Sequence, residues 1–431
     1  MAHVSFRHFV RIAHDEVSVG HPDAVKKILL APLDKGYWYA GIKNPDYRFI
    51  APFVVTNPKE KIELSKALAS GYTLGSVLQA EDTMNSTIEN LLGWMDKHAE
   101  TGKSMRLDLF LRFSAFDILG DVIFSKQFGL TREGRDVGNA IATVTQMSFA
   151  VVFGYYSRWR SLFLSNPLIT WLQILPMGHI HETAMKAISE RQKNVDARFD
   201  VVAHWFKMLQ EHPERLNLRN IQSQATNSIS AGADTVATAM QTFIYFTIKH
   251  PRVLARVQEE IATALENGLC NTKVVTYADA QKLPYLQVCI KEALRFCHPV
   301  SMSLPRVAPA GGIEIGDRKF PQGTILSVNG WVIHLSEEIW GPDAREFNPD
   351  RWFREDAAEL EKKYFIPYSA GYESCPGHHI AKLELSKVLT TIMRDYDIRQ
   401  VDQNHVWKIK AYMTVIPDAW PVYLKKRNMN D

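Results

Sequence analysis

Residues 368–377 read YSAGYESCPG and place one thiol, Cys375, in a glycine-bearing loop. Apolar side chains recur at three- and four-residue intervals directly after this loop, at Ala381, Leu385, Val388 and Ile392. This spacing predicts a helix with one apolar face, and Pro376 suits its first position, where a missing N–H costs nothing. Cys375 would then lie at the positive end of the helix dipole, which favours a thiolate. The loop therefore predicts a soft metal ligand at Cys375, with a buried structural cysteine as the alternative.

A second segment, AGADT at residues 231–235, lies inside an apolar pattern that predicts a long helix over about 221–250. Glycine inside a helix costs about 1 kcal/mol relative to alanine, so Gly232 indicates that something bulky approaches the helix there. Asp234 and Thr235 offer a proton path, since an acid and a hydroxyl are unfavourable if merely buried on an apolar element. An ordinary contact of small residues between two helices, with a solvated Asp234, explains the pattern equally well.

Two further segments carry charges at short spacing. KEALR at residues 291–295 places Glu292 and Arg295 three positions apart, close enough to pair on one face of a helix. FNPDRW at residues 347–352 is a proline-bearing loop that presents Arg351. Each pattern is common alone, but an ordered set of motifs is far more specific than any single match.

The four segments, in this order, resemble the cytochrome P-450 superfamily of heme-thiolate monooxygenases, and fungal members most of all. That family carries Ala/Gly-Gly-x-Asp/Glu-Thr on a helix, then Glu-x-x-Arg, a Pro-x-Arg loop, and Phe-x-x-Gly-x-Arg-x-Cys-x-Gly. The resemblance runs from about Val10 to Tyr423. It implies a mainly α fold with small β-sheets (α+β), in which heme lies between a long central helix and the helix after the cysteine loop.

The resemblance also implies roles for individual residues. Cys375 is expected to be the axial ligand of the iron of heme b. The other expected cofactor contacts are Tyr368, Gly371, Gly377, Arg306 and Lys66, with Arg306 and Lys66 directed at heme propionates. Thr235 would hold the distal oxygen atom or a water beside it, and Asp234 would relay protons. Glu292, Arg295 and Arg351 would form a buried structural triad behind the heme.

The chain departs from the family pattern two residues before the cysteine. Glu373 stands where the family has an arginine that contacts a propionate. A carboxylate beside a propionate repels it unless it is protonated or turned away. Arg306, Lys66 or His378 are expected to compensate, and replacing Glu373 with arginine is expected to raise heme retention or leave it level. Tyr368 replaces the usual phenylalanine, which is a mild change.

Composition agrees with a large enzyme. The chain has 431 residues, of which 46% are hydrophobic, and a formal net charge of +3. A chain of this length can bury a large core, and its balanced charge gives no indication of nucleic acid binding. No linker marks a domain boundary, so we expect a single domain over 1–431. Four cysteines without framework spacing fit a reducing compartment. No Gly-x-Gly-x-x-Gly fingerprint occurs, so electrons are expected from a separate NADPH-cytochrome P-450 reductase.

The amino end is expected to be truncated. Residues 1–11 contain no apolar run near the roughly 20 residues that span a bilayer, and they do not resemble a signal peptide. Phe9–Ile12 and Glu16–Val19 alternate like strands, and residues 21–23 open a helix. Eukaryotic members of the family carry a membrane helix before such a strand pair, so a lost first exon is the favoured explanation. The protein is expected to be cytoplasmic or peripheral on the endoplasmic reticulum, with a membrane anchor if it is truncated.

Residues 147–177 are rich in aromatic side chains and leucine. In the family such a segment forms a mobile lid over the substrate pocket and often contacts the membrane. We expect it to help select an apolar small-molecule substrate, in a pocket lined mainly by apolar side chains. A core helix is the alternative.

The expected activity is insertion of one oxygen atom from O2 into an apolar small molecule, in fungal secondary metabolism. A catalytically impaired heme-thiolate protein is one alternative, and an isomerase or dehydratase that needs no reductase is another. A third alternative is a non-enzymatic zinc protein in which Cys375, His378 and His379 form half of the metal site; structural zinc needs four ligands, usually in two spaced pairs.

Overall fold

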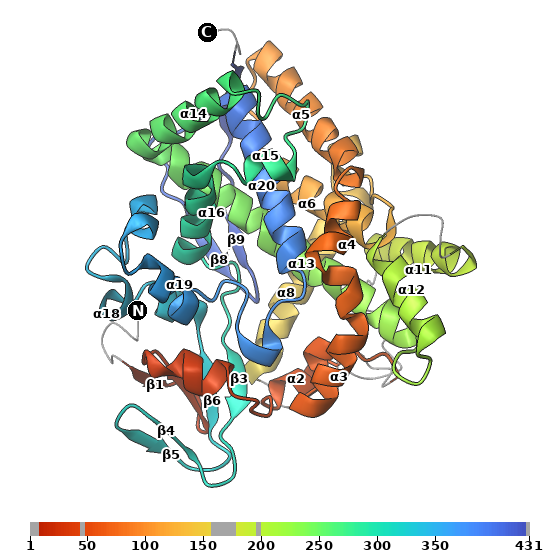
Figure 1. Cartoon of the computed structure of the whole chain (residues 1–431), viewed down its shortest axis with the longest axis vertical. Coiled ribbons are helices and arrows are strands. Elements are labelled where there is room, and N and C mark those ends of the chain that lie inside the picture. Colours follow the sequence, from red (N-terminus) through yellow and green to blue (C-terminus); the bar gives the residue numbers. More distant parts are fainter. Residues whose placement is uncertain (1–7, 44–47, 157–177, 195–199, 428–431) are drawn as a thin grey trace.

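The computed structural model describes residues 8–43, 48–156, 178–194 and 200–427, and it is mainly helical with small sheets (Figure 1). The α-helices are α2 (Trp38–Gly41), α3 (Pro58–Leu68), α4 (Leu74–Gln79), α5 (Thr83–Thr101), α6 (Leu107–Phe124), α7 (Leu130–Glu133), α8 (Ala140–Tyr156), α11 (Gly178–Lys193), α12 (Val201–Glu211), α13 (Leu218–Lys249), α14 (Pro251–Glu266), α15 (Tyr277–Ala280), α16 (Pro284–Phe296), α17 (Gly330–His334), α18 (Glu337–Trp340), α19 (Ala357–Tyr364) and α20 (His378–Asp395). Short 3-10 or π turns are η1 (Val25–Leu29), η2 (Pro52–Val54), η3 (Ala69–Tyr72), η4 (Val137–Asn139), η6 (Pro349–Phe353) and η7 (Gly371–Glu373). The expected mainly α class is confirmed.

The strands are short. They are β1 (Phe9–Arg11), β2 (Glu16–Val19), β3 (Leu304–Val307), β4 (Ile313–Ile315), β5 (Arg318–Phe320), β6 (Ile325–Val328), β7 (Tyr396–Gln400), β8 (Ile409–Ala411), β9 (Val415–Pro417) and β10 (Val422–Lys426). One four-stranded sheet has the order β1-β2-β6-β3, with β2 and β6 parallel and its other pairs antiparallel. Figure 1 shows labelled strands of this sheet and the β4–β5 hairpin at one end of the molecule. The second expected strand matches β2, and the first ends one position early, at Arg11.

Helix α13 is the long central helix that the apolar pattern predicts. Asn217 caps its first turn, because its side chain accepts from the Asn220 N–H while the Asn220 side chain accepts from the Asn217 N–H. Helix α6, whose residues are almost all buried, packs along α13, and α16 and α20 also pack on it. These contacts explain why the second half of α13, from Val236 on, is mostly buried.

The cysteine loop lies where two hydrophobic cores meet. The larger core is built mainly from α5, α6, α13, α16 and α20, and Tyr368 packs against it. The smaller core lies among η1, the four-stranded sheet and α17 to α19, and Ala370 packs against it. The loop is thus fixed from both sides, which positions Cys375.

Candidate active site

The backbone holds the Cys375 loop in place. The Cys375 N–H donates to the Tyr368 carbonyl at 2.8 Å, and His378 Nδ1 hydrogen-bonds the Cys375 carbonyl at 2.8 Å. Gly371 has a φ of +67°, and a Cβ there would lie 2.4 Å from the Leu29 carbonyl oxygen. Only glycine fits this position, so its evident role is backbone packing.

Cys375 is exposed as a residue, although the surrounding protein desolvates its thiol. This desolvation raises the thiol pKa, and a hydrogen bond from the Gly377 N–H opposes the rise. Helix α20 begins at His378, so Pro376 lies in the preceding turn and not at the first helical position. The prediction that the helix end lowers the thiol pKa is therefore wrong for the free thiol. A bound metal cation would favour the thiolate.

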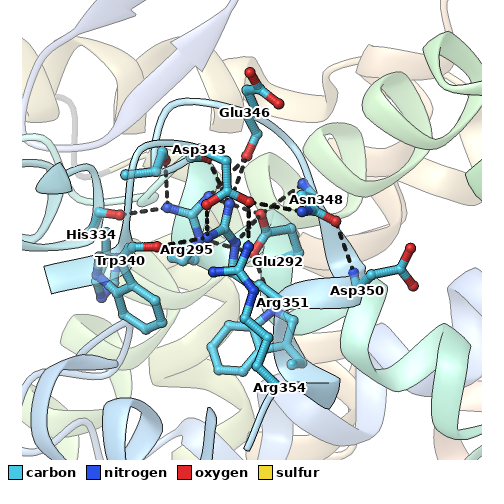
Figure 2. Close-up of polar contacts among 12 residues, drawn as sticks. Glu292, Arg295, His334, Trp340, Asp343, Glu346, Asn348, Asp350, Arg351 and Arg354 are labelled. Atoms are coloured by element: carbon cyan, nitrogen blue, oxygen red, sulfur yellow. Dashed lines mark hydrogen bonds and ion pairs between the residues drawn. The ribbon is translucent and has the colours of Figure 1, made fainter. Parts of the chain in front are cut away.

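Glu292 and Arg295 on α16 meet Arg351 of η6 in the protein interior (Figure 2). Arg295 donates Nε and Nη2 to the two Glu292 carboxylate oxygens, each at 2.8 Å, and Arg351 Nε donates to Glu292 Oε1 at 3.0 Å. The three residues are 0%, 0% and 3% exposed. We call this set the Glu292 triad.

Every side-chain nitrogen and oxygen of the Glu292 triad is hydrogen-bonded. The remaining Arg295 and Arg351 donors reach the carbonyls of His334, Trp340, Asp343, Ala344 and Glu346 and the Asp343 carboxylate. Glu292 also accepts from the Asn348 N–H at 2.9 Å and from Trp352 Nε1 at 3.1 Å. A buried ion set is tolerated when it is satisfied in this way. The triad thus ties α16 to the loops around η6.

Gly232 serves helix packing. A Cβ at this position would lie 2.8 Å from Leu119 Cδ1 on α6. The simpler interpretation, a small-residue contact between helices, therefore accounts for Gly232. By contrast, Ala231 is exposed and Thr235 is partly exposed, and several residues between Gln222 and Ser230 on the same helix are partly exposed as well. One face of α13 is consequently open at this point.

Asp234 and Thr235 face different surroundings. Asp234 is 2% exposed, and its Oδ1 accepts from Arg112 Nε at 3.1 Å and Nη2 at 2.8 Å. Its Oδ2 has no hydrogen-bond partner within the described residues. The Thr235 hydroxyl donates to the carbonyls of Ala231 and Gly232, at 3.1 and 2.9 Å. The sequence analysis did not anticipate Arg112, since no spacing connects α6 with Asp234.

Tyr72 of η3 relates the cysteine loop to α13. Its hydroxyl lies 2.7 Å from Ser228 Oγ and accepts from Gln224 Nε2 at 2.9 Å, and both partners are on α13. Burial raises the pKa of Tyr72 to about 12, and the nearby Cys375 thiolate charge adds to this rise. Tyr72 thus bonds the first half of α13 and also feels the charge of Cys375.

Glu373 lies among cations. Its Oε1 is 2.9 Å from Lys35 Nζ and 3.7 Å from Lys61 Nζ, and the side chains are 4%, 0% and 9% exposed respectively. Arg306, which pairs with Lys35 in a β-bridge, is completely buried. It donates Nη1 to the Tyr39 hydroxyl at 3.1 Å, while its Nε and Nη2 have no hydrogen-bond partner among the described residues. We call Lys35, Lys61, Arg306 and Glu373 the Glu373 cluster.

The structure does not bring Lys66 to this cluster. Its side chain is 61% exposed and pairs with Glu63 at 2.8 Å. Lys61, five positions earlier in α3, lies on the buried side of that helix. The expectation for Lys66 is wrong, because Lys66 lies on the solvent-facing side of the amphipathic helix α3 and its side chain points away from the core. In the family an early helix carries Trp/His-x-x-x-Arg, and residues 61–66 take its place here, so Lys61 was a second lysine in that stretch that could have been considered. Lys35 had no such signal.

A comparison with family models matches residues 6–419 to "Cytochrome P450". This chain belongs to the cytochrome P450 family. Among curated relatives, the cytochrome P450 monooxygenase cicH of Emericella nidulans is 28% identical over 437 residues, covering 99% of this chain and 88% of the relative. Pisatin demethylase of Fusarium vanettenii is also 28% identical, covering 90% of this chain and 75% of its own.

Solved structures show the same fold. The heme domain of cytochrome P450DA matches this P450 with a TM-score of 0.79 at 17% identity, covering 98% of this chain and 90% of that one. A second P450 structure, CYP102L1, matches with a TM-score of 0.78 at 20% identity. The fungal cytochrome P450 assignment, the fold and the monooxygenase class are thereby confirmed.

The family implies heme b as the cofactor, and residues of this chain fit it. Cys375 is exposed and offers its sulfur as the iron ligand, which is the donor that P450 enzymes use. Ala231 and Thr235 lie on the open face of α13. Arg306 carries buried N–H groups without partners, which suits the carboxylate of a propionate.

The described ranges contain no group of three or more His, Cys, Asp or Glu side chains that could hold a metal ion. The rings of His378 and His379 are tilted by 42° to each other with centroids 3.9 Å apart, and His378 hydrogen-bonds the Cys375 carbonyl. The zinc hypothesis therefore finds no ligand set in this part of the chain.

The predicted lid falls largely outside the described residues, which leave out 157–177. Its first part, from Met147 on, belongs to α8, where Met147 and Phe149 are 40% and 48% exposed. No helix in the described ranges is long and apolar enough to cross a bilayer.

Proposed function

We propose that this P450 inserts one oxygen atom from O2 into an apolar small molecule of fungal secondary metabolism, using electrons from a separate NADPH-cytochrome P-450 reductase. One observation carries the proposal. Cys375 is exposed, and its charge acts on Tyr72, which hydrogen-bonds Ser228 on α13, about two turns before Thr235 on the same helix. The names of the fungal relatives support the monooxygenase class.

When bound, heme supplies the activation of O2, and the protein supplies orientation and protons. Thr235 would hold a water or an oxygen atom at the open face, because its hydroxyl is already oriented by the Ala231 and Gly232 carbonyls. Asp234 would take up a proton at Oδ2, the oxygen that Arg112 leaves free. Arg112 holds this carboxylate in place through its two hydrogen bonds to Oδ1. These roles require the intact Asp234-Thr235 pair.

The test is reductase-dependent turnover. Purified holoenzyme is mixed with a fungal NADPH-cytochrome P-450 reductase and a panel of apolar terpenoids, polyketides and indoles. We expect substrate-dependent NADPH oxidation with a hydroxylated product, and neither without the reductase. Conversion of a substrate without NADPH and reductase would contradict the proposal and favour an isomerase or dehydratase.

The alternative of an impaired enzyme rests on Glu373. Two lysines lie within 4 Å of this carboxylate, at 2.9 and 3.7 Å. Their positive charges offset the repulsion that Glu373 would exert on a heme propionate. This observation favours a working enzyme with altered heme contacts.

A further inference from the structure

The Glu373 cluster joins segments that are far apart in the sequence. Lys35 follows η1, Lys61 is on α3, Arg306 is on β3 and Glu373 ends η7. All four residues are at least 90% buried, with exposed fractions of 4%, 7%, 0% and 8%. Burying charges is costly unless they are paired. The cluster therefore needs an explanation from its own contacts.

Lys35 is fully occupied within the protein. Its Nζ donates to the Phe53 carbonyl at 2.8 Å, lies 3.4 Å from the Pro52 carbonyl, and pairs with Glu373 at 2.9 Å. An ammonium group has three donors; two reach carbonyls, and the ammonium also forms an ion pair with Glu373 Oε1, although that contact does not have the geometry of a hydrogen bond. Lys35 and Glu373 form a neutral pair.

Lys61 and Arg306 have hydrogen-bond donors that no protein group in the described residues accepts from. Lys61 Nζ donates to the Tyr372 carbonyl and lies farther from Glu373, at 3.7 Å, than Lys35 does. Arg306 Nε and Nη2 are buried without a hydrogen-bond partner in the described part of the chain. Buried donors in native proteins nearly always have a partner. Two positive charges with spare donors thus remain after Lys35 has cancelled Glu373.

Heme b carries two propionate carboxylates, which match these two charges in number. We propose that Lys61 and Arg306 bind the heme propionates, and that Glu373, neutralised by Lys35, positions Lys61 in place of the arginine that other P450s carry at this point of the loop. The proposal rests on the heme assignment of this P450. Glu373 is a positioning residue, since it would not touch the cofactor.

Apoprotein is titrated with hemin and with hemin dimethyl ester, which lacks both carboxylates, and the dissociation constants are followed by Soret absorbance. The wild type should bind hemin more tightly than the ester. Lys61→Met should weaken hemin binding by about 10-fold or more, because a charge-assisted hydrogen bond contributes about 1.5–3 kcal/mol. The ester should be affected much less. Lys66→Met, an exposed lysine on the same helix, is the matched control and should bind like the wild type.

A double-variant cycle tests the neutral pair. Lys35→Met alone should weaken hemin binding by about 10-fold, because it leaves the Glu373 charge uncompensated beside the carboxylates. Lys35→Met/Glu373→Gln should bind hemin more tightly than Lys35→Met, because the uncompensated charge is gone, but more weakly than the wild type, because the amide no longer holds Lys61 by its charge. Thermal melting of the apoproteins shows that each variant folds.

The proposal is overturned if hemin and its ester bind equally, if Lys66→Met weakens binding as much as Lys61→Met, or if the double variant binds no better than Lys35→Met. These outcomes leave the thiolate spectrum of the wild type unchanged. A wild type without thiolate coordination would instead contradict the proposed function.

Discussion

Two buried charged clusters in this P450 differ in how completely they are satisfied. In the Glu292 triad every side-chain donor and acceptor has a protein partner. In the Glu373 cluster, Arg306 keeps two buried nitrogens without a partner among the described residues. A saturated ion set supports structure, because nothing remains to bind a ligand. A buried ion set that keeps hydrogen-bond donors without partners indicates a binding site.

The largest effect is expected in the saturated set. Glu292→Gln removes the carboxylate charge from two buried arginines, and breaking such a pair costs about 3–5 kcal/mol. Urea unfolding of the holoprotein measures this loss. Lys273→Gln is the control, since Lys273 pairs with Glu89 at the surface at 2.8 Å and should cost about 0–1 kcal/mol. Similar losses in both variants would contradict the role of the triad.

Glu373→Arg should destabilise the protein by about 2–3 kcal/mol, less than Glu292→Gln, because the lysines can lose protons to relieve repulsion. The variant would bury four cations together. This differs from the expectation from the sequence that arginine here raises heme retention or leaves it level. Melting of apoprotein and hemin titration measure both effects. A variant with higher stability and tighter hemin binding would show that the cluster is not arranged as described.

A smaller effect is expected from pH. Burial lowers the pKa of Lys35 to about 8; the Glu373 charge acts to raise this pKa, and the charges of Arg306 and Lys61 act to lower it. The Tyr39 ring also faces the Lys35 ammonium. Because the unfolded value of 10.5 is higher, the unfolded apoprotein binds more protons between these values, so apoprotein stability rises with pH there. Propionates raise the Lys35 pKa, so hemin binding takes up a proton and weakens above pH 8.

The control for this pH effect is Lys35→Arg, which stays charged. Above pH 8 the wild type should lose hemin affinity by up to about tenfold per pH unit relative to Lys35→Arg. Deprotonation of Cys375 affects both proteins alike. Parallel pH profiles would contradict the assigned role of Lys35.

The smallest change in stability is expected at the open face of α13. Thr235→Ala should alter the free energy of unfolding by less than about 1 kcal/mol, because Thr235 only bonds carbonyls of its own helix. Electron use should nevertheless become uncoupled from product formation. NADPH and product are measured together, and coupling equal to that of the wild type would exclude the proposed role of Thr235.

The sequence predicts local patterns better than contacts between distant segments. Glu292 and Arg295 are three residues apart on one helix, so their pairing can be read directly. Gly232 cannot be interpreted without Leu119, which lies on another helix. Glu373 and Lys35 are separated by most of the chain, and only the fold brings them to 2.9 Å.

The thiol of Cys375 illustrates a different limit. The helix after the loop was predicted correctly, but its first residue is His378, and burial outweighs the favourable N–H group of Gly377. Sequence gives the sign of each electrostatic effect, whereas their balance depends on burial that only the folded chain defines.

The central claim is that Cys375 provides a thiolate to heme iron. The most direct test is the optical spectrum of the reduced carbon monoxide complex of the wild type and of Cys375→Ser. We expect a strongly red-shifted Soret band in the wild type and its loss in the variant. A wild-type band typical of a neutral axial ligand, or a red-shifted band that persists in Cys375→Ser, would contradict this account.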